Sequence, residues 1–393
     1  MPPRAYLDHN ATTPLHPAAL EAMRAVLARP GNASSVHAEG RAARAAIENA
    51  RLELGAFVNA PAKAIIFTSG GTEALNLALT PSIDGADGPR PFDRLLIGAA
   101  EHSAVLNGHR FPADRAEIVA LAGDGALDLE ALGAALARHK GERVMLALQA
   151  ANNETGVIQP VAAAAELVHA AGGFVLCDAV QAAGKIDCDM TRLGADALVL
   201  SAHKFGGPQG VGALCFASPA SHIRATMIRG GGQERGLRAG TENVAAIAGM
   251  AAALRISAER LRRQSEVLAS WRDRLEAEVS RIAPDAAFFG AARERLPNTS
   301  CFAVPGIEAQ VLLMCLDVEG VAVSSGSACS SGKVKRSHVL TAMGVAPNLA
   351  NGAIRVSLGW DSSEDDCALF VKALEKAVRS LKARLPGAPG QAA

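Results

Sequence analysis

The sequence ALVLSAHKFGGPQG, residues 197–210, places a lysine at the polar end of an apolar strand. Four apolar residues form the expected strand, and Ser201, His203 and Lys204 follow it before two glycines and a proline interrupt the chain. A lysine amine in this position can form a Schiff base with a carbonyl cofactor, because burial and cationic neighbours lower its pKa. An ordinary exposed lysine at the end of a strand is the alternative, and these residues alone leave both interpretations open.

Apolar runs of strand length lie on both sides of this segment and alternate with helical sequences. Most of the runs are continuously apolar, which is typical of a sheet covered on both faces. The alternation predicts an α/β fold with a mostly parallel sheet. The strand at 211–216 follows after a turn too short for a crossover helix, so we expect it to be antiparallel to its predecessor. The expected strands are 64–68, 94–98, 144–148, 174–177, 197–200 and 211–216, with helices at 72–79, 129–139 and 161–170.

A long helical stretch, residues 242–282, follows this region. Its first half is apolar and its second half is charged, which suits a helix that leaves one domain and enters another. Beyond it we expect strands at 299–304, 321–324 and 354–358 and helices at 309–316 and 365–385. The chain is therefore predicted to have a large domain, a smaller α/β domain and a disordered tail, with residues 15–257, 1–14 plus 258–385, and 386–393 respectively.

The composition excludes several classes of function. Apolar residues make up 49% of the chain and charged residues 20%, as in a soluble globular enzyme and unlike a disordered chain. The 39 basic and 39 acidic side chains cancel, which argues against nucleic acid or an anionic membrane as a partner. The N-terminus lacks the apolar region of a secretion signal, and no apolar run is long enough to span a bilayer.

The seven cysteines are scattered and contain no C-x-x-C pair. We therefore expect neither a disulfide framework nor a metal site, and a reducing cytoplasm is the expected location. Cys329 stands apart because it lies in the Gly/Ser-rich segment SSGSACSSGKVKR, residues 324–336, whose basic residues favour its thiolate. An unused thiol on a linker is the alternative, but protein surfaces tend to avoid one, so the segment favours a nucleophile.

Polar residues follow several of the expected strands. In TSGGTE, residues 68–73, two glycines permit a tight turn, and the start of the next helix offers free N–H groups to a phosphate. A plain turn between strand and helix is the alternative. Asp178 and Gln181 follow another strand, at the sheet edge where open α/β proteins bind ligands. A carboxylate there can keep a pyridine nitrogen protonated, although the local pattern alone favours a helix N-cap.

Three further segments carry groups with two interpretations each. His102, in AEHSA directly after a strand, can stack on a ring or transfer a proton, and a surface histidine is the simpler interpretation. In AANNETG, residues 150–156, the amides of Asn152 and Asn153 can hold a substrate carboxylate or a cofactor oxygen, although the segment also suits a plain turn. The glycine-rich basic loop at 228–243 is either a flexible flap or a loop that binds anions or bridges subunits.

Ten motifs, in order, resemble those of the pyridoxal-phosphate (PLP)-dependent cysteine desulfurases. These belong to the class V aminotransferases, and the closer resemblance is to the branch that serves nitrogen fixation and iron–sulfur assembly. The resemblance extends from Tyr6 to Gly359, and the ordered set is specific where each motif alone is not. The motifs are YLDHNATTP (6–14), GNASSVH (31–37), TSGGTEALN (68–76), EHSA (101–104), NNETGV (152–157), DAVQAAGK (178–185), SAHKFGGPQGVG (201–212), GGGQERGLRAGTEN (230–243), SSGSACSSG (324–332) and AIRVSLG (353–359).

The resemblance implies PLP fold type I, a homodimer and a set of site residues. Lys204 would hold PLP as a Schiff base, Asp178 would pair with the ring nitrogen, and Gln181 would contact the ring hydroxyl. His102 would stack on the ring. The remaining implied contacts are Gly71, Thr72, Ser201 and His203 at the phosphate, Thr241 from the partner subunit, and Asn153 and Arg355 at the substrate carboxylate.

The implied reaction converts L-cysteine to L-alanine, with Lys204, His102 and Cys329 as catalytic residues. Lys204 moves the Cα proton, and Cys329 attacks the substrate sulfur and carries it as a persulfide to a sulfur-acceptor or iron–sulfur scaffold protein. A selenocysteine lyase or a same-fold aminotransferase is the alternative enzyme, although an aminotransferase does not need Cys329. An inactive scaffold-binding subunit is the non-enzyme alternative, which the intact lysine, aspartate and cysteine argue against.

Overall fold

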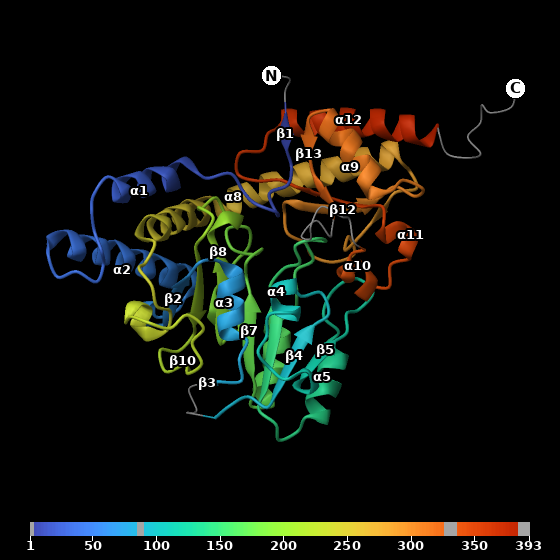
Figure 1. Cartoon of the computed structure of the whole chain (residues 1–393). Helices are drawn as coiled ribbons and strands as arrows, with labels where there is room; N and C mark the ends of the chain where they lie inside the picture. Colours follow the sequence, from blue (N-terminus) through green and yellow to red (C-terminus); the bar gives the residue numbers. More distant parts are fainter. Residues whose placement is uncertain (1–3, 85–89, 326–335, 384–393) are drawn as a thin grey trace, which may run out of the picture.

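The computed structural model describes residues 4–84, 90–325 and 336–383 (Figure 1). These residues form a large, mostly parallel sheet with helices around it and a smaller sheet beside it, which confirms the predicted α/β fold. Cys329 and the tail at 386–393 lie outside the described residues, so what the sequence implies for them stays a prediction.

Seven strands of the described chain form the large sheet. Five of them, β8, β7, β6, β4 and β5, run parallel, whereas β9 is antiparallel to both of its neighbours, β8 and β2. The antiparallel pairing of β8 with β9 is as predicted, because the short turn between them leaves no room for a crossover. In spatial order the strands are β2 (Ile65–Thr68), β9 (Gly212–Phe216), β8 (Ala197–Ser201), β7 (Phe174–Asp178), β6 (Val144–Gln149), β4 (Arg94–Gly98) and β5 (Ala116–Val119).

The sequence reading missed the edge strand β5. Its residues are mostly half-buried, and the side chain of Ile118 is 52% exposed. A strand at the edge of a sheet is only partly covered, so it lacks the continuous apolar run that marks the central strands.

Helices cover both faces of the large sheet, as its apolar strands require. In β8, Leu198 and Leu200 pack into the core on one face, and Val199 packs into the core on the other, because successive side chains of a strand alternate. The first face is covered by α1 (Pro17–Leu27), α2 (Ala38–Val58), α5 (Leu129–Arg138), α6 (Val161–Ala170), α7 (Met190–Leu193) and the start of α8 (Val244–Ile282), and the second by α3 (Gly71–Ala78) and α4 (Ser103–Leu106). A short ribbon pairs β3 (Ile83–Asp84) with β10 (His222–Ile223).

The smaller sheet is antiparallel and joins distant parts of the chain. Its order is β11 (Ala287–Phe288), β12 (Thr299–Ala303), β15 (Ala353–Ser357) and β14 (Ser324–Ser325). The strand expected at 321–324 is in fact two: β13 (Val321–Ala322) pairs with β1 (Ala5–Tyr6), and the chain then changes partner to form β14. A third core lies among these strands, the second half of α8, α9 (Ala309–Val318) and α12 (Glu364–Lys382), with α10 (His338–Ala342) and α11 (Pro347–Ala350) nearby.

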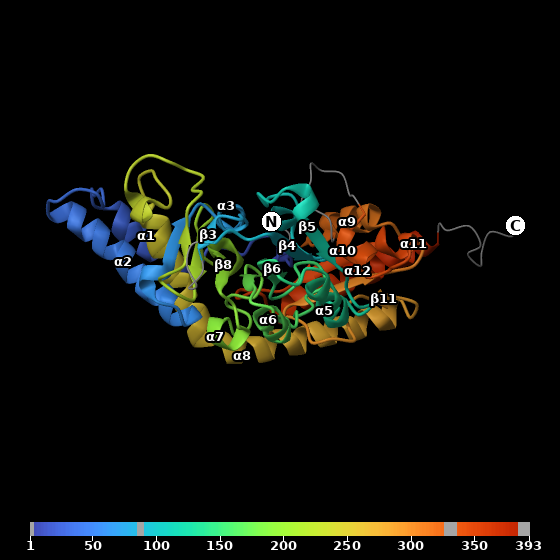
Figure 2. The same cartoon turned by 90° about the horizontal axis from the view of Figure 1, so that it is seen from below.

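Helix α8 connects the two parts of the molecule, and Figure 2 shows it running along both. The side chain of Asn243 caps its first turn by accepting a hydrogen bond from the backbone N–H of Ala246. Its buried positions through Leu254 belong to the core of the large sheet, and those from Leu268 onward belong to the core of the smaller sheet. The predicted domain boundary at 257–258 falls between them. Neither α8 nor any other helix in the described part of the chain has the length and apolar character needed to cross a membrane.

Candidate active site

A cavity of about 660 Å³ opens at the carboxyl ends of the parallel strands. This is the edge of an open α/β sheet at which ligands bind, because the loops that leave the strands converge there. Ten of the site residues predicted from the sequence line this cavity: Gly71, Thr72, His102, Asn153, Asp178, Gln181, Ser201, His203, Lys204 and Arg355.

Lys204 ends the short 3-10 turn η3 (Ala202–Lys204) that follows β8, and it lines the cavity. Its Nζ donates to the backbone carbonyl of Asn10 at 2.6 Å and to that of Ala11 at 2.8 Å. The N-terminal segment is therefore folded against this amine. Asn10 lies in the YLDHNATTP motif, but its contact with Lys204 could not be predicted from the sequence, because any residue type supplies a backbone carbonyl.

The turn before α3 forms a cradle suited to an anion. The backbone N–H groups at the start of α3 and the side chain of Thr72 border the cavity, beside Ser201 and His203. A Cβ added to Gly71 would lie 2.9 Å from Val180 Cγ2 and 3.3 Å from Ser201 Cβ, so this close approach requires glycine. Burial, together with the charges of nearby lysines, lowers the pKa of His203 to about 4, which leaves its ring neutral.

Asp178 ends β7 at the floor of the cavity. Its side chain accepts a hydrogen bond from the N–H of Val180 at 2.9 Å, but the following residues form a turn, so the N-cap that its local pattern favours is not found. Burial raises the pKa of Asp178, while the Val180 N–H and the nearby His102 and Lys204 oppose the rise. Behind it lies Glu101, fully buried, whose Oε1 accepts from the N–H of Gln149. Sequence reasoning missed this second acid.

His102 lines the cavity and caps the short helix α4. Its Nδ1 accepts a hydrogen bond from the N–H of Ala104 at 3.1 Å, which assigns the proton of the neutral ring to Nε2. Burial lowers the pKa of His102, an effect that Asp178 opposes and Lys204 and His338 strengthen. The ring is therefore a partly buried neutral imidazole rather than the surface histidine that its local sequence also allowed.

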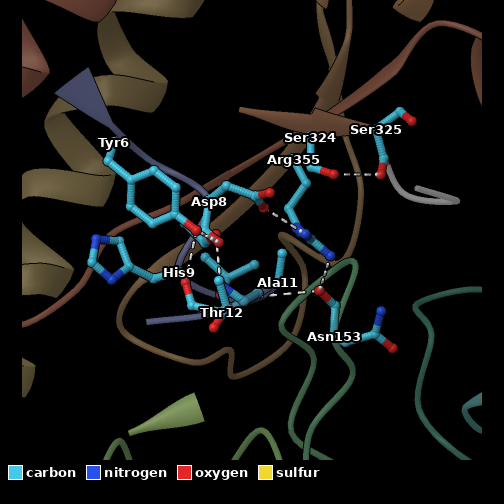
Figure 3. A network of polar contacts seen from close by, with 12 residues as sticks. Tyr6, Asp8, His9, Ala11, Thr12, Asn153, Ser324, Ser325 and Arg355 are labelled. Atoms are coloured by element: carbon cyan, nitrogen blue, oxygen red, sulfur yellow. Dashed lines mark hydrogen bonds and ion pairs between the residues drawn. The ribbon is translucent and has the colours of Figure 1, made fainter. Parts of the chain in front are cut away.

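Arg355, Asp8 and Asn153 meet at the side of the cavity formed by the smaller sheet, as Figure 3 shows. Arg355 Nη2 binds Asp8 Oδ1 at 2.7 Å, and its Nη1 donates to the backbone carbonyl of Asn153 at 3.0 Å. Arg355 is 4% exposed, and its Nε has no hydrogen-bond partner among the described residues. The guanidinium lines the cavity, and its planar group of donors is suited to a carboxylate. The neighbouring Asn152 uses its side chain to shape the turn.

One predicted site residue of the described chain, Thr241, does not line the cavity. Thr241 is exposed, in the loop between η4 (Gln233–Gly236) and α8. Cys329 lies outside the described residues, but the chain on both sides of its segment is described. Ser324 lines the cavity, and Ser337 Oγ donates to Glu154 Oε2 at 2.5 Å, next to Asn153.

Comparison with known proteins identifies the family. The Aminotransferase class-V family matches residues 5–370. A cysteine desulfurase of Cereibacter sphaeroides is 41% identical over 397 residues, covering 98% of this chain and 98% of the relative. The solved structure of a NifS-like protein from Rickettsia africae ESF-5 has a TM-score of 0.86 at 32% identity, covering 96% of this chain and 100% of that chain. SspA in complex with cysteine has a TM-score of 0.73 at 25% identity, covering 90% and 98%.

The similarity to the NifS-like structure also confirms PLP fold type I as the fold class. The matches extend over nearly the whole chain, as do the ten motifs found in the sequence. The chain belongs to the class-V aminotransferase family, within its cysteine desulfurase branch.

Proposed function

We propose that this protein is a cysteine desulfurase that converts L-cysteine to L-alanine and holds the sulfur as a persulfide on Cys329. The observation that carries this proposal is the convergence of Lys204, Asp178 and Arg355 on one cavity. An amine, a buried acid and a guanidinium there supply an attachment point for a carbonyl cofactor, a partner for a ring nitrogen and a partner for a substrate carboxylate.

The cofactor of this family is PLP, and the cavity residues fit it. The glycine cradle at the start of α3 and the hydroxyls of Thr72 and Ser201 suit a phosphate, and Asp178 suits a pyridinium nitrogen. We assign Gln181 to the ring hydroxyl and His102 to the ring face. When bound, PLP supplies an electron sink that stabilises negative charge at the Cα of an attached amino acid.

The protein's own groups divide the remaining tasks. Lys204 Nζ attaches the cofactor, and once freed from it moves the Cα proton. Arg355 and Asn153, which both line the cavity, hold the carboxylate of cysteine. His102 carries a proton on Nε2 and is thus a donor at the cavity surface. The SspA structure, which contains cysteine, supports this choice of substrate.

The six cysteines of the described chain are poor candidates for the sulfur acceptor, which supports Cys329 in that role. None of the six lines the cavity, and four of them are buried. Burial raises the pKa of five of these thiols, to about 12 for Cys188 and Cys215, to about 11 for Cys367, and also for Cys177 and Cys301. A thiolate nucleophile needs an environment that lowers its pKa instead.

The proposed sulfur transfer forms one bond and breaks one. The thiolate sulfur of Cys329 bonds to the substrate sulfur, the C–S bond of cysteine breaks, and the electron pair of that bond and a proton remain with alanine.

We further propose that the protein acts as a homodimer in the cytoplasm and passes sulfur to an acceptor or iron–sulfur scaffold protein. Several large apolar side chains are exposed on α1, α2 and the loops near them, including Leu27 (70%), Val36 (88%) and Leu52 (60%). In a homodimer the partner subunit would cover these side chains. Thr241 is exposed and outside its own cavity, which fits a contact with the partner's cofactor phosphate.

Mass spectrometry of the purified holoenzyme after incubation with L-cysteine tests the proposed function. We expect one added sulfur on the peptide that carries Cys329 and release of L-alanine. Cys329→Ala is expected to keep the visible absorption of bound PLP and to lose the added sulfur, whereas Lys204→Ala is expected to lose the visible band. Cys315→Ala is the matched control. Alanine formation unaffected by Cys329→Ala would favour a lyase, and formation of the 2-oxo acid of cysteine in place of alanine would favour an aminotransferase. A wild-type protein that never binds PLP would contradict the proposal.

A further inference from the structure

A second lysine, Lys185, lies behind the cavity wall and has no role in the function proposed above. It is 9% exposed and does not line the large cavity. Its Nζ donates to Gln181 Oε1 at 3.0 Å and to the Gln181 backbone carbonyl at 3.1 Å. A small cavity of about 40 Å³, large enough for a water molecule, is lined by both Lys185 and Lys204. A buried amine is thus held between a cofactor-contacting residue and the attachment lysine.

These bonds determine which way the amide of Gln181 faces. The Lys185 amine donates its hydrogens, so it contacts the oxygen of the Gln181 amide. A backbone carbonyl can only accept a hydrogen bond, so the carbonyl contacts the amide nitrogen. Gln181 Nε2 accordingly donates to the carbonyl of Asn10 at 2.9 Å, and the same carbonyl accepts from Lys204 Nζ. The second hydrogen of Nε2 remains for a ligand of the cavity that Gln181 lines. Lys185 at Oε1 and the Asn10 carbonyl at Nε2 therefore select the same orientation of the amide, and loss of Lys185 removes one of these two contacts.

Lys185 also has no carboxylate partner among the described ion pairs. Burial, together with the charges of Lys204 and Arg355, lowers the pKa of Lys185 to about 7, and Cys188 opposes this shift. Lys185 in turn helps to lower the pKa of His9 and His203. Its neighbours are therefore mostly cationic or neutral. Such an arrangement costs stability unless it serves an anionic ligand nearby.

We propose that Lys185 is a positioning residue of the cofactor site: it fixes the amide of Gln181 with its N–H toward the ring oxygen of PLP. It also adds positive charge behind that oxygen. This inference rests on the proposed function, because it presumes PLP bound at Lys204. Both effects stabilise a negative charge on the ring oxygen and disfavour the binding of a further proton nearby. Lys185 therefore lowers the pH at which the visible absorption band of bound PLP has changed by half, which is the midpoint of its pH titration.

The test is a pH titration of the visible band in the holoenzyme. Lys185→Met is expected to retain bound PLP and to raise the midpoint by about one pH unit or more, because it removes a nearby donor and positive charge. Gln181→Leu is expected to raise it in the same direction. The double variant should show less than the sum of the two shifts, since Lys185 acts partly through Gln181. Lys63→Met, at an exposed lysine, is the control with an unchanged midpoint.

Each outcome decides the inference. A wild-type midpoint in Lys185→Met, or fully additive shifts in the double variant, would overturn it. Lys185→Gln provides a second polar replacement if the methionine variant does not fold, and an unchanged midpoint there has the same meaning. If neither Lys185 variant folds, an unchanged midpoint in Gln181→Leu overturns the proposal. A wild-type protein without a visible band would instead contradict the proposed function, independently of Lys185.

Discussion

Glu154 is a buried acid whose ionisation opposes folding near neutral pH. It is 3% exposed and accepts a hydrogen bond from Ser337. Burial raises its pKa from 4.5 to about 7, although the Ser337 hydrogen bond and the charge of Arg355 both oppose the rise. Between these two pH values the folded protein binds more protons than the unfolded chain, so the contribution of Glu154 to stability falls as pH rises.

Glu154→Gln is therefore expected to gain stability relative to wild type as pH increases from 4.5 to about 7. Glutamine does not ionise, yet its carbonyl can still accept from Ser337, so the gain reaches at most about 3 kcal/mol. Denaturant unfolding of both proteins across this range measures the difference. The control for the loss of a carboxylate is Glu166→Gln, on the exposed side of α6. A difference for Glu154→Gln that does not change with pH would contradict this assignment.

Arg355→Lys tests the proposed substrate contact at the same scale. Lysine keeps the positive charge but lacks the planar fork, so we expect the KM for L-cysteine to rise by about tenfold or more. The visible absorption of bound PLP should not change, because Arg355 is assigned to the substrate. Steady-state kinetics and absorption spectra check both expectations. Arg293→Lys, on an exposed ion pair with Asp124, is the matched control, and an unchanged KM in Arg355→Lys refutes the role.

At the scale of elements, the edge of the large sheet at β2 is closed by side chains. The Arg51 guanidinium binds the Glu234 carboxylate through two contacts of 2.8 Å and also donates to the backbone carbonyl of Ile65. Glu234 in turn accepts from the N–H of Phe67. Both charged side chains are nearly fully buried. An open edge would attract other strands, and here its polar groups are satisfied by α2 and by the loop before α8.

Arg51→Met is expected to destabilise the protein by about 3–5 kcal/mol, because it leaves the Glu234 carboxylate buried without a partner. Thermal and denaturant unfolding measure the loss. The control is Glu48→Gln, a half-exposed carboxylate that also contacts Arg51, for which we expect about 0–1 kcal/mol. The double variant Arg51→Met with Glu234→Gln should be more stable than Arg51→Met alone. An effect no larger than that of Glu48→Gln would show that the pair does not hold the edge.

At the scale of the whole molecule, the candidate site depends on both parts of the fold. The N-terminal strand β1 pairs with β13 beside the smaller sheet, yet Asn10 and Ala11 just after it contact Lys204 at the end of β8. Arg355 comes from β15 of the smaller sheet. The cavity therefore forms only when the two parts pack together. The proposed dimer extends this dependence to a second copy of the chain.

Mixed dimers test whether Thr241 serves the partner's site. Thr241→Asp is expected to abolish most activity, since it places a negative charge against the cofactor phosphate. Lys204→Ala abolishes the chain's own site. If Thr241 acts across the interface, dimers that contain one chain of each kind have one intact site, and activity is restored on mixing. Activity assays of isolated mixed dimers measure this, and no restoration would mean that Thr241 does not act in the partner.

Much of the fold could be predicted from the sequence because central strands and long helices carry regular patterns. The strands on both sides of Lys204, helix α6 and the antiparallel β9 follow from apolar runs and a short turn. The edge strand β5 and the division of residues 321–325 between β13 and β14 could not be predicted. Partial exposure weakens the apolar pattern of β5, and the strands that pair with β13 and β14 are distant from them in sequence.

The sequence by itself determined the residue types of the candidate site, since lysine, aspartate, glycine and arginine at strand ends and turns limit the chemistry that can occur there. Only the tertiary structure decided which of them meet. It placed Arg355 against Asp8 and Asn153, and it revealed the buried amine of Lys185 behind Gln181. The reason is physical: local patterns record burial and backbone preference, whereas contacts between residues far apart in the chain exist only after both cores have packed.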